Sequence, residues 1–398
     1  MTLFRPEAFE QLVDTPWNET RAREGIRAIV ADADDSFRGR RLFWQADEWD
    51  RWHGTSPMKN LYVGTAGVLW ALDRLRRDGH ATTTLDLADL ATVNVELFRE
   101  RPDFPKGMKL PAPRESALLT GEAGILLVAW RLAPRRELAD DLLALVRKNV
   151  DNEAEEVMWG SPGTMIAAAA MFEWTDDQRW RDAWNESADA LLSRRDADGF
   201  WTQRLYGQET RSLTPPHGLV GNVQALVPLL DGARARTLAR ESAAALARAA
   251  VVADGLANWP PRKRPDLPGP DGQIRVQWCA GAPGIVVGAS GYLDEELLLA
   301  GGELPWRTGP PNLEKGPGIC HGTAGNGHAF LKVFARTGDE RWLQRARRFA
   351  MHALAQVERL RSKRGRGRHS LWTGDVGVAL YAADCIDGTG RYPFFDSC

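Results

Sequence analysis

The chain has 398 residues, of which 43% are hydrophobic and 26% charged, a composition typical of a globular protein with a large buried core. The formal net charge of -2 at pH 7 argues against a general nucleic-acid-binding protein, because such proteins usually carry a basic excess. No apolar run approaches the ~20 residues of a membrane-spanning helix, and the N-terminal residues lack the apolar core of a secretory signal. We therefore expect a cytoplasmic protein.

Seven copies of the motif Gly-x-x-Gly, each followed by an apolar stretch, divide the chain into repeats. The third residue of every copy is Ala, Pro or Val, and the apolar residues that follow have helical spacing. Glycine permits a positive φ in the entering turn and lets neighbouring segments approach closely. We therefore expect each copy to begin a helix. The first glycines of the seven copies are Gly64, Gly121, Gly160, Gly218, Gly281, Gly322 and Gly374.

The 39 to 63 residues between successive first glycines leave room for two helices and their loops. Amphipathic segments rich in Ala, Leu and Arg lie between motifs, for example near 234–252 and 340–360. Alternating β-branched residues are scarce, so strands should be few. The pattern predicts an all-α fold, an (α/α)7 toroid whose seven inner helices begin at one end of a central cavity. Residues 1–54 are expected to be a helical extension packed on this barrel, which 55–398 form.

Three segments between the motifs have the composition of loops. The Pro- and Gly-rich segments 260–276 and 301–318 are predicted to be surface loops over the cavity mouth. The basic run 362–369 is predicted to be a solvated turn, with binding of an acidic or phosphorylated peptide as the alternative. We interpret none of them as a domain linker, so a single domain is expected.

Two cysteines and a histidine precede the fifth and sixth motifs. Cys279 lies two residues before its first glycine, and Cys320 and His321 lie two and one before theirs, so adjacent repeats carry these residues at equivalent places. Two thiolates and one imidazole suit Zn²⁺, and three protein ligands leave a fourth position open, as in catalytic zinc sites. The alternative is that both cysteines are small buried hydrophobic residues.

Candidate acid–base residues flank other motifs. His217 directly precedes the fourth motif and should point into the cavity, where an imidazole can give or take a proton near neutral pH. Arg275 lies four residues before the first cysteine and is predicted to hold an oxyanion or enolate, with a surface ion pair as the alternative. Glu155 and Glu156 precede the third motif. Glu156 is the favoured acid for orienting His217 or acting as a base, although both remain open.

The remaining cysteines and one further histidine have less specific surroundings. Cys385 is predicted to lie in the core of the last inner helix, and the C-terminal Cys398 to be a free exposed thiol. His328 lies two helical turns beyond the ligand histidine and is predicted to be in the core or behind the ligands. Three tryptophans that abut motifs are expected to line the cavity: Trp159, Trp278 and Trp372.

The motifs HGLVG, WCAGAPG and CHGTAGNG, in this order among seven repeats, resemble those of the lanthionine synthetase C-like (LanC-like) family. The resemblance covers roughly residues 55–390, and the cysteine-bearing pair of motifs is its most diagnostic part. It implies an α-toroid in which Cys279, Cys320 and His321 bind zinc. It also implies active-site roles for three further residues: His217, Arg275 and, more loosely, Glu156.

The resemblance implies a reaction in which a thiol adds to the β-carbon of dehydroalanine or dehydrobutyrine in a peptide and gives a thioether. The thiol would belong to the same peptide, as in the bacterial cyclases, or to glutathione, as in the eukaryotic-type relatives. The chain has no recognisable kinase or lyase portion, so a separate dehydratase or kinase is expected. The alternatives are a non-catalytic adaptor that binds zinc, glutathione or a peptide, and an α-toroid glycosidase, which would need paired carboxylates across the cavity.

Overall fold

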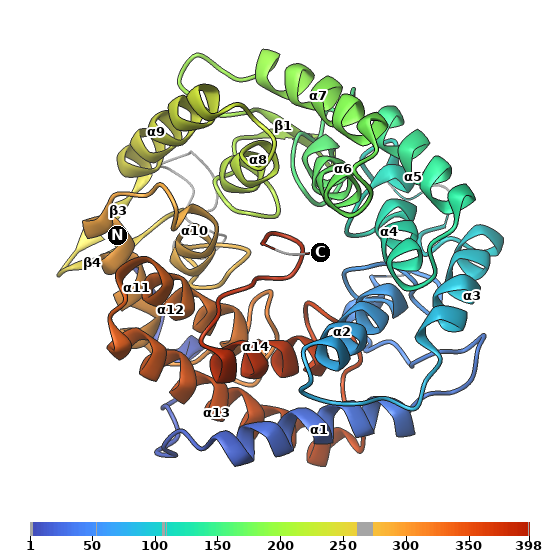
Figure 1. Ribbon diagram of the computed structural model, residues 1–398. Coiled ribbons are helices and arrows are strands. Elements are labelled where there is room, and N and C mark those ends of the chain that lie inside the picture. The colour runs from blue at the N-terminus through green and yellow to red at the C-terminus, as the bar shows by residue number, and fades with distance from the viewer. Residues whose placement is uncertain (1–2, 53, 106–107, 109, 261–273, 397) are drawn as a thin grey trace.

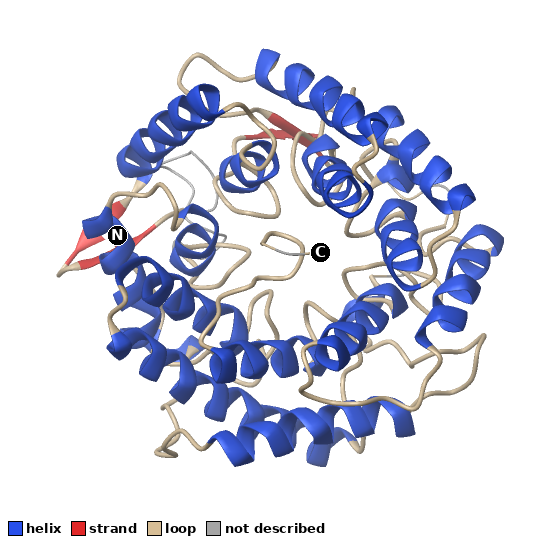
Figure 2. Ribbon diagram, in the orientation of Figure 1, coloured by secondary structure: helices blue, strands red, loops and turns tan. Residues whose placement is uncertain are grey.

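A computed structural model describes residues 3–52, 54–105, 108, 110–260, 274–396 and 398. These described residues form fourteen α-helices, three single-turn 3-10 helices and two short β-hairpins. The all-α class is therefore confirmed, and Figure 2 shows how little of the chain is strand. The hairpins pair β1 (Gln203–Leu205) with β2 (Gln208–Thr210), and β3 (Val251–Ala253) with β4 (Leu256–Asn258).

The helices form two concentric rings around one axis, which confirms the predicted (α/α)7 toroid (Figure 1). The inner ring consists of α2 (Thr65–Arg77), α4 (Glu122–Leu132), α6 (Ser161–Thr175), α8 (Leu219–Leu226), α10 (Ala282–Ala289), α12 (Thr323–Thr337) and α14 (Asp375–Asp387). The outer ring consists of α3 (Leu87–Glu100), α5 (Arg136–Lys148), α7 (Gln178–Ser193), α9 (Gly232–Ala249), α11 (Glu295–Thr308), α13 (Glu340–Arg364) and α1 (Glu19–Asp35).

The two rings differ in how their side chains are distributed. Every residue of α10 is buried, as expected for a helix that is apolar all round and has neighbours on every side. In α5, by contrast, the buried residues Leu138, Leu142, Leu143 and Val146 follow helical spacing and form one face. The amphipathic helices therefore lie outside, with their apolar faces turned toward the inner ring.

Each of the seven first glycines is the N-cap of an inner helix, as predicted. The expected positive φ was wrong for all of them except Gly281, where φ is 119°. Close approach of backbone is the general reason for glycine in the motif. A Cβ at Gly284 would lie 1.8 Å from the Trp278 carbonyl oxygen, and one at Gly325 would lie 2.0 Å from that of Ile319.

The residue two positions before each first glycine, which we call the minus-two position, joins neighbouring repeats. The N–H of one minus-two residue donates to the carbonyl of another in the adjacent repeat, with N···O distances of 2.8 to 3.3 Å. Cys279 and Cys320 are bonded to each other in this way, so the backbone itself brings the two cysteines together. Five such bonds run from Tyr62 to Leu119, Met158 to Pro216, Cys279 to Cys320, Cys320 to Trp372, and Trp372 to Tyr62.

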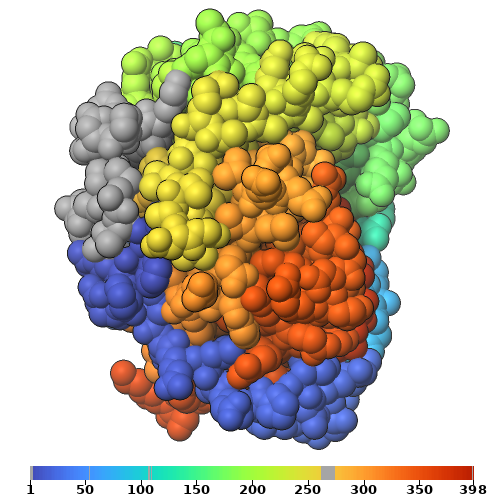
Figure 3. Space-filling model, turned by 90° about the vertical axis from the view of Figure 1, so that its left-hand side faces the viewer, coloured from blue at the N-terminus to red at the C-terminus, as the bar shows by residue number. Residues whose placement is uncertain are grey.

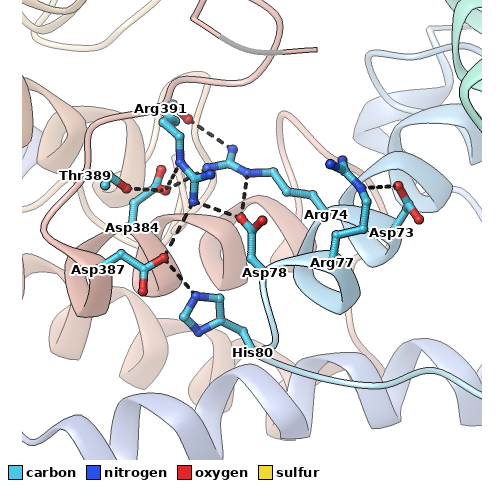
Figure 4. A network of polar contacts seen from close by, with 9 residues as sticks. All are labelled: Asp73, Arg74, Arg77, Asp78, His80, Asp384, Asp387, Thr389 and Arg391. Carbon is cyan, nitrogen blue, oxygen red and sulfur yellow. Dashed lines mark hydrogen bonds and ion pairs between the residues drawn. The ribbon is translucent and has the colours of Figure 1, made fainter. Parts of the chain in front are cut away.

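The ring is closed between its first and last inner helices. Arg74 of α2 donates to Asp384 of α14 over 2.7 Å, and both side chains are buried. Arg391 lies 2.8 Å from Asp78 and 3.6 Å from Asp384, so the two helices share one network of arginine and aspartate side chains (Figure 4). Helix α1 packs outside α14 and takes the outer place of the seventh pair (Figure 1).

The chain after α14 turns into the centre of the ring (Figure 1). Phe394 packs against Trp70 with ring centroids 4.6 Å apart, and Tyr392 stacks on Trp278 at 4.9 Å. Trp278 is fully buried, as are the other two tryptophans that abut motifs, so they belong to the packed interior instead of lining an open cavity. Cys398 is half-buried and not the exposed thiol that was predicted.

The N-terminal residues run along the outside of the C-terminal helices, and Figure 3 shows this blue region beside the orange part of the chain. Phe9 forms an isolated β-bridge with Pro311, and the Val13 N–H donates to His352 Nδ1 over 3.1 Å. No helix in the described part of the chain combines the length and apolarity needed to cross a lipid bilayer.

Two of the loop predictions were wrong in part, and most of a third falls outside the described residues. The segment 301–318 begins as the second half of α11, whose Pro305 is buried. The basic run 362–369 begins inside α13. Beyond the helix, Arg368 donates a hydrogen bond to Asp50 over 2.8 Å, so this part of the run packs on the rest of the protein. Residues 261–273 of the first predicted loop lie outside the described residues.

Candidate metal centre

The side chains of Cys279, Cys320 and His321 converge at the end of the toroid where the inner helices begin. Their potential ligand atoms all lie within 4.8 Å of one another, and Cys279 Sγ is 4.0 Å from His321 Nδ1. Tetrahedral zinc with Zn–S bonds of 2.3 Å and Zn–N bonds of 2.0 Å separates its ligand atoms by roughly 3.5–3.8 Å. The three residues therefore fit a zinc ion after shifts of less than about 1 Å.

Local structure explains how the sulfurs are presented. Gln277 and Ala280 exchange two backbone hydrogen bonds of 3.2 and 3.1 Å, and Cys279 lies in the tight turn between them. Helix α10 begins three residues after Cys279, and α12 begins three residues after Cys320 and two after His321. Because the N-terminus of a helix carries partial positive charge, this arrangement favours negative charge at the pair of sulfurs.

The two thiols have opposite acid–base character. The hydrogen bond from Cys320, together with His321 and its charge, holds the pKa of Cys279 well below its ordinary value, although burial opposes this effect. Burial and the neighbouring thiolate raise the pKa of Cys320 well above its ordinary value. The pair therefore favours one thiolate and one thiol, and a bound cation would stabilise both sulfurs as thiolates.

Each sulfur accepts a hydrogen bond from a side chain that the sequence did not single out. The Tyr62 hydroxyl donates to Cys320 Sγ over 2.8 Å and is buried in the first repeat, 258 residues away. The Gln277 side-chain amide donates to Cys279 Sγ over 3.2 Å. Tyr62 occupies the minus-two position of its own repeat, which is the one sequence signal that could have pointed to it.

A second unexpected neighbour comes from the 3-10 helix η2 (Trp49–Arg51). The Trp49 ring meets the His321 imidazole edge-on with centroids 4.9 Å apart, and 55% of Trp49 remains exposed. The Arg368 guanidinium lies 5.2 Å from the Trp49 ring centroid and pairs with the buried Asp50. The N-terminal segment thus forms part of the wall beside the candidate metal ligands.

His217 lies on the same end of the toroid and is paired with a carboxylate. Its Nδ1 is 2.7 Å from Glu156 Oε2, and Glu156 is fully buried. Glu156 also accepts hydrogen bonds from the backbone N–H groups of Met158 and Trp159, so its position is fixed by the turn before α6. The charge of His217 contributes to the lowered pKa of Cys279.

The adjacent Glu155 points elsewhere. Its backbone φ is 46°, and its carboxylate lies 3.7 Å from Arg194. Burial raises the pKa of Glu155 to about 7, against the opposing charge of Arg194. Of the two candidate acids, Glu156 is the one that contacts His217.

The other candidates lie apart from this cluster. The Arg275 side chain is exposed, and within the described residues no hydrogen bond or ion pair joins it to the sulfurs or to His217. Cys385 and His328 are both buried in the core. Tyr206, at the tip of the β1–β2 hairpin, was not anticipated: it accepts a 2.8 Å hydrogen bond from Trp159, next to Glu156.

Comparison with known proteins shows which family the chain is related to. The profile of a family described as "Lanthionine synthetase C-like protein" matches residues 55–397. The chain belongs to the LanC-like family. It is 32% identical to "Glutathione S-transferase LANCL1" of Danio rerio over 142 residues, which are 31% of this chain and 32% of that protein. It is 31% identical to "LanC-like protein GCL1" of Arabidopsis thaliana over 133 residues, 30% of each chain.

These alignments span about a third of the curated relatives that the chain matches. A solved structure, "Nisin cyclase", has a TM-score of 0.59 to this chain and covers 92% of it, while the alignment covers 94% of that structure. Since the sequence identity is 14%, this likeness establishes the LanC-like toroid and not a shared substrate.

Proposed function

We propose that this LanC-like protein is a zinc-dependent enzyme that joins a thiol to dehydroalanine or dehydrobutyrine in a peptide and forms a thioether. The observation that carries the proposal is the convergence of Cys279, Cys320 and His321 within 4.8 Å. The His217–Glu156 pair, joined over 2.7 Å, precedes inner helices at the same end of the toroid and supports the proposal. A thiol-activating metal site next to an acid–base pair supplies both groups that this addition requires.

The donor set is suited to zinc and to an additional sulfur ligand. Cys279, Cys320 and His321 would hold the ion and leave its fourth position for substrate. Bound there, zinc would favour the thiolate form of an incoming thiol near neutral pH. Two anionic cysteine ligands lower the net positive charge of such a site, so a substrate thiolate should remain nucleophilic.

The chain's own residues would then manage charge and the proton. As the substrate sulfur bonds to the β-carbon, the π-electron pair of the double bond moves to Cα and its carbonyl oxygen. We assign to His217 the delivery of a proton to Cα, so that the elements of S–H are added across the double bond. Glu156 orients the imidazole and stabilises its cationic form. Arg275, four residues before Cys279, is our candidate for stabilising the enolate oxygen.

Two sources of thiol fit this chemistry. Glutathione agrees with the name of the zebrafish relative, and a cysteine of the same peptide agrees with the name of the cyclase whose fold is shared. In both cases we propose that a separate dehydratase or kinase takes part in making the dehydrated residue. A toroid that binds zinc and peptide without catalysis is the alternative, and it would need no acid–base pair.

The test begins with metal content. Elemental mass spectrometry of the purified protein should find about one zinc per chain, as expected for a single three-residue ligand set. Cys279→Ala and Cys320→Ala should lose it, and Cys385→Ala should keep it, because Cys385 is a buried thiol of α14 remote from the ligands. The zinc-loaded protein is then incubated with a dehydroalanine peptide, either with glutathione or with a cysteine in the same peptide. Adduct mass or loss of an alkylatable thiol reports the reaction, and full thioether formation by Cys279→Ala would refute the proposal.

A further inference from the structure

We infer that Tyr62 and Gln277 are positioning residues that fix the two metal-binding sulfurs, each by donating one hydrogen bond to one sulfur. The inference rests on the proposed zinc site and adds to it two residues outside the three ligands. The Tyr62 hydroxyl donates a hydrogen bond to Cys320 Sγ over 2.8 Å, and the Gln277 amide donates one to Cys279 Sγ over 3.2 Å. Each sulfur therefore has its own hydrogen-bond donor, and the two donors come from distant parts of the sequence.

Tyr62 is held so that its hydroxyl has little freedom to point elsewhere. Its ring lies between Trp52, with centroids 5.5 Å apart, and Trp372, at 5.6 Å. Its backbone N–H donates to Leu119, and its carbonyl accepts from Trp372. Only 4% of the residue is exposed, so water cannot readily replace its hydroxyl as a donor to the sulfur.

Gln277 is restrained by the same turn that presents its partner. Its backbone exchanges two hydrogen bonds with Ala280, which bracket Cys279, and the residue is 8% exposed. A ligand whose outer side is hydrogen-bonded is held in one orientation, and removal of such a partner typically weakens metal binding by about 10–100-fold. A donor also stabilises the lone pairs of a thiolate, which changes the energy needed to transfer an electron from sulfur to a metal.

Both consequences can be measured on the intact protein without a peptide substrate. The variants are Tyr62→Phe and Gln277→Met, which remove a donor and keep the side-chain size. The matched control is Tyr392→Phe. Tyr392 is equally buried in the same aromatic cluster, but its hydroxyl donates to the Ile319 carbonyl over 2.6 Å and not to a sulfur.

Zinc affinity is determined by competition with a chromophoric chelator, and the thiolate-to-cobalt charge-transfer band is recorded after loading with Co²⁺. We expect Tyr62→Phe and Gln277→Met each to raise the zinc dissociation constant about 10–100-fold. Each should also move the charge-transfer band to longer wavelength, because an unprotected thiolate gives up an electron more easily. Tyr392→Phe should change neither quantity.

The outcomes separate this inference from the function on which it rests. If the unaltered protein binds neither zinc nor cobalt at one ion per chain, the metal site fails, and the role of both residues fails with it. If the unaltered protein binds both metals and the two variants match it in affinity and spectrum, the positioning role alone is refuted. Equal shifts in Tyr392→Phe would also refute it, because the effect would then be a general loosening of the aromatic cluster.

Discussion

Replacement of Gly284 by alanine should disrupt the turn that presents Cys279. The added Cβ would lie 1.8 Å from the Trp278 carbonyl oxygen, whereas real Cβ atoms keep at least 3.0 Å, so the carbonyl must move by about 1.2 Å. Trp278 cannot easily yield, because it is fully buried and packs on Trp372 and Tyr392 with ring centroids 4.9 Å away. Forced displacement in a packed core costs about 1–3 kcal/mol, and this site lies at the upper end of that range.

Because Cys279 follows Trp278 directly, the same displacement moves one sulfur by a distance that a metal site does not tolerate. We expect Gly284→Ala to lower the unfolding free energy by about 3 kcal/mol in urea denaturation followed by tryptophan fluorescence. It should also bind less than one zinc per chain. Gly291→Ala is the control, because its Cβ would meet no atom within 4 Å. A Gly284→Ala protein within about 0.5 kcal/mol of the unaltered one and with full zinc content would refute the reasoning.

Three further predictions concern other parts of the toroid. Burial raises the pKa of Asp384 to about 7 against its arginine partners, so the folded protein holds this proton while the unfolded chain, with a pKa near 4, has lost it. Asp384 should therefore contribute a fall in unfolding free energy of about 1.4 kcal/mol per pH unit as pH rises from about 4 to 7. Asp384→Asn should remove this contribution, and the same pH dependence of unfolding free energy in the two proteins would contradict the prediction. Phe394→Ala should cost about 3–5 kcal/mol, measured in urea, because Phe394 is 2% exposed and packs on Trp70; a loss below 1 kcal/mol would mean that the C-terminal segment does not fill the ring centre in solution. Glu156→Gln should keep the zinc content and lower the turnover of thioether formation by about 10²–10⁴-fold, because an amide cannot stabilise a cationic His217. Unchanged turnover would exclude the His217–Glu156 pair from the reaction.

The sequence was informative wherever a feature repeats. The start of every inner helix followed from the Gly-x-x-Gly motif, because two closely approaching backbone segments leave no room for a Cβ at its second glycine. The contact between Cys279 and Cys320 followed from their equivalent positions in adjacent repeats. Successive repeats are related by a rotation about the axis of the toroid, so equivalent residues of adjacent repeats lie close together. These predictions therefore needed no knowledge of side-chain packing.

The sequence was uninformative wherever a contact depends on closing the ring. Tyr62 contacts Cys320, and Trp49 contacts His321, across more than 250 residues, because closing the ring brings the start of the chain beside the sixth repeat. The choice between Glu155 and Glu156 depended on one backbone angle. The positive φ of Glu155 directs its carboxylate to Arg194, while its neighbour turns inward to the imidazole, and nothing in the residue types shows which of two adjacent acids adopts that angle.

The minus-two position shows how one frame can carry different chemistry in each repeat. A backbone N–H or carbonyl at this position joins neighbouring repeats, and at Tyr62, Cys320 and Trp372 both groups do so, so the ring fixes the backbone from which the side chain projects. Leucine, methionine and tryptophan at this position fill the core, whereas cysteine in two adjacent repeats places two sulfurs in ligand range and tyrosine supplies a donor to one of them. Because the frame already fixes the backbone, exchanging a cysteine or tyrosine here should alter the metal site far more than the stability of the toroid, which is the separation that the zinc and denaturation measurements above are designed to detect.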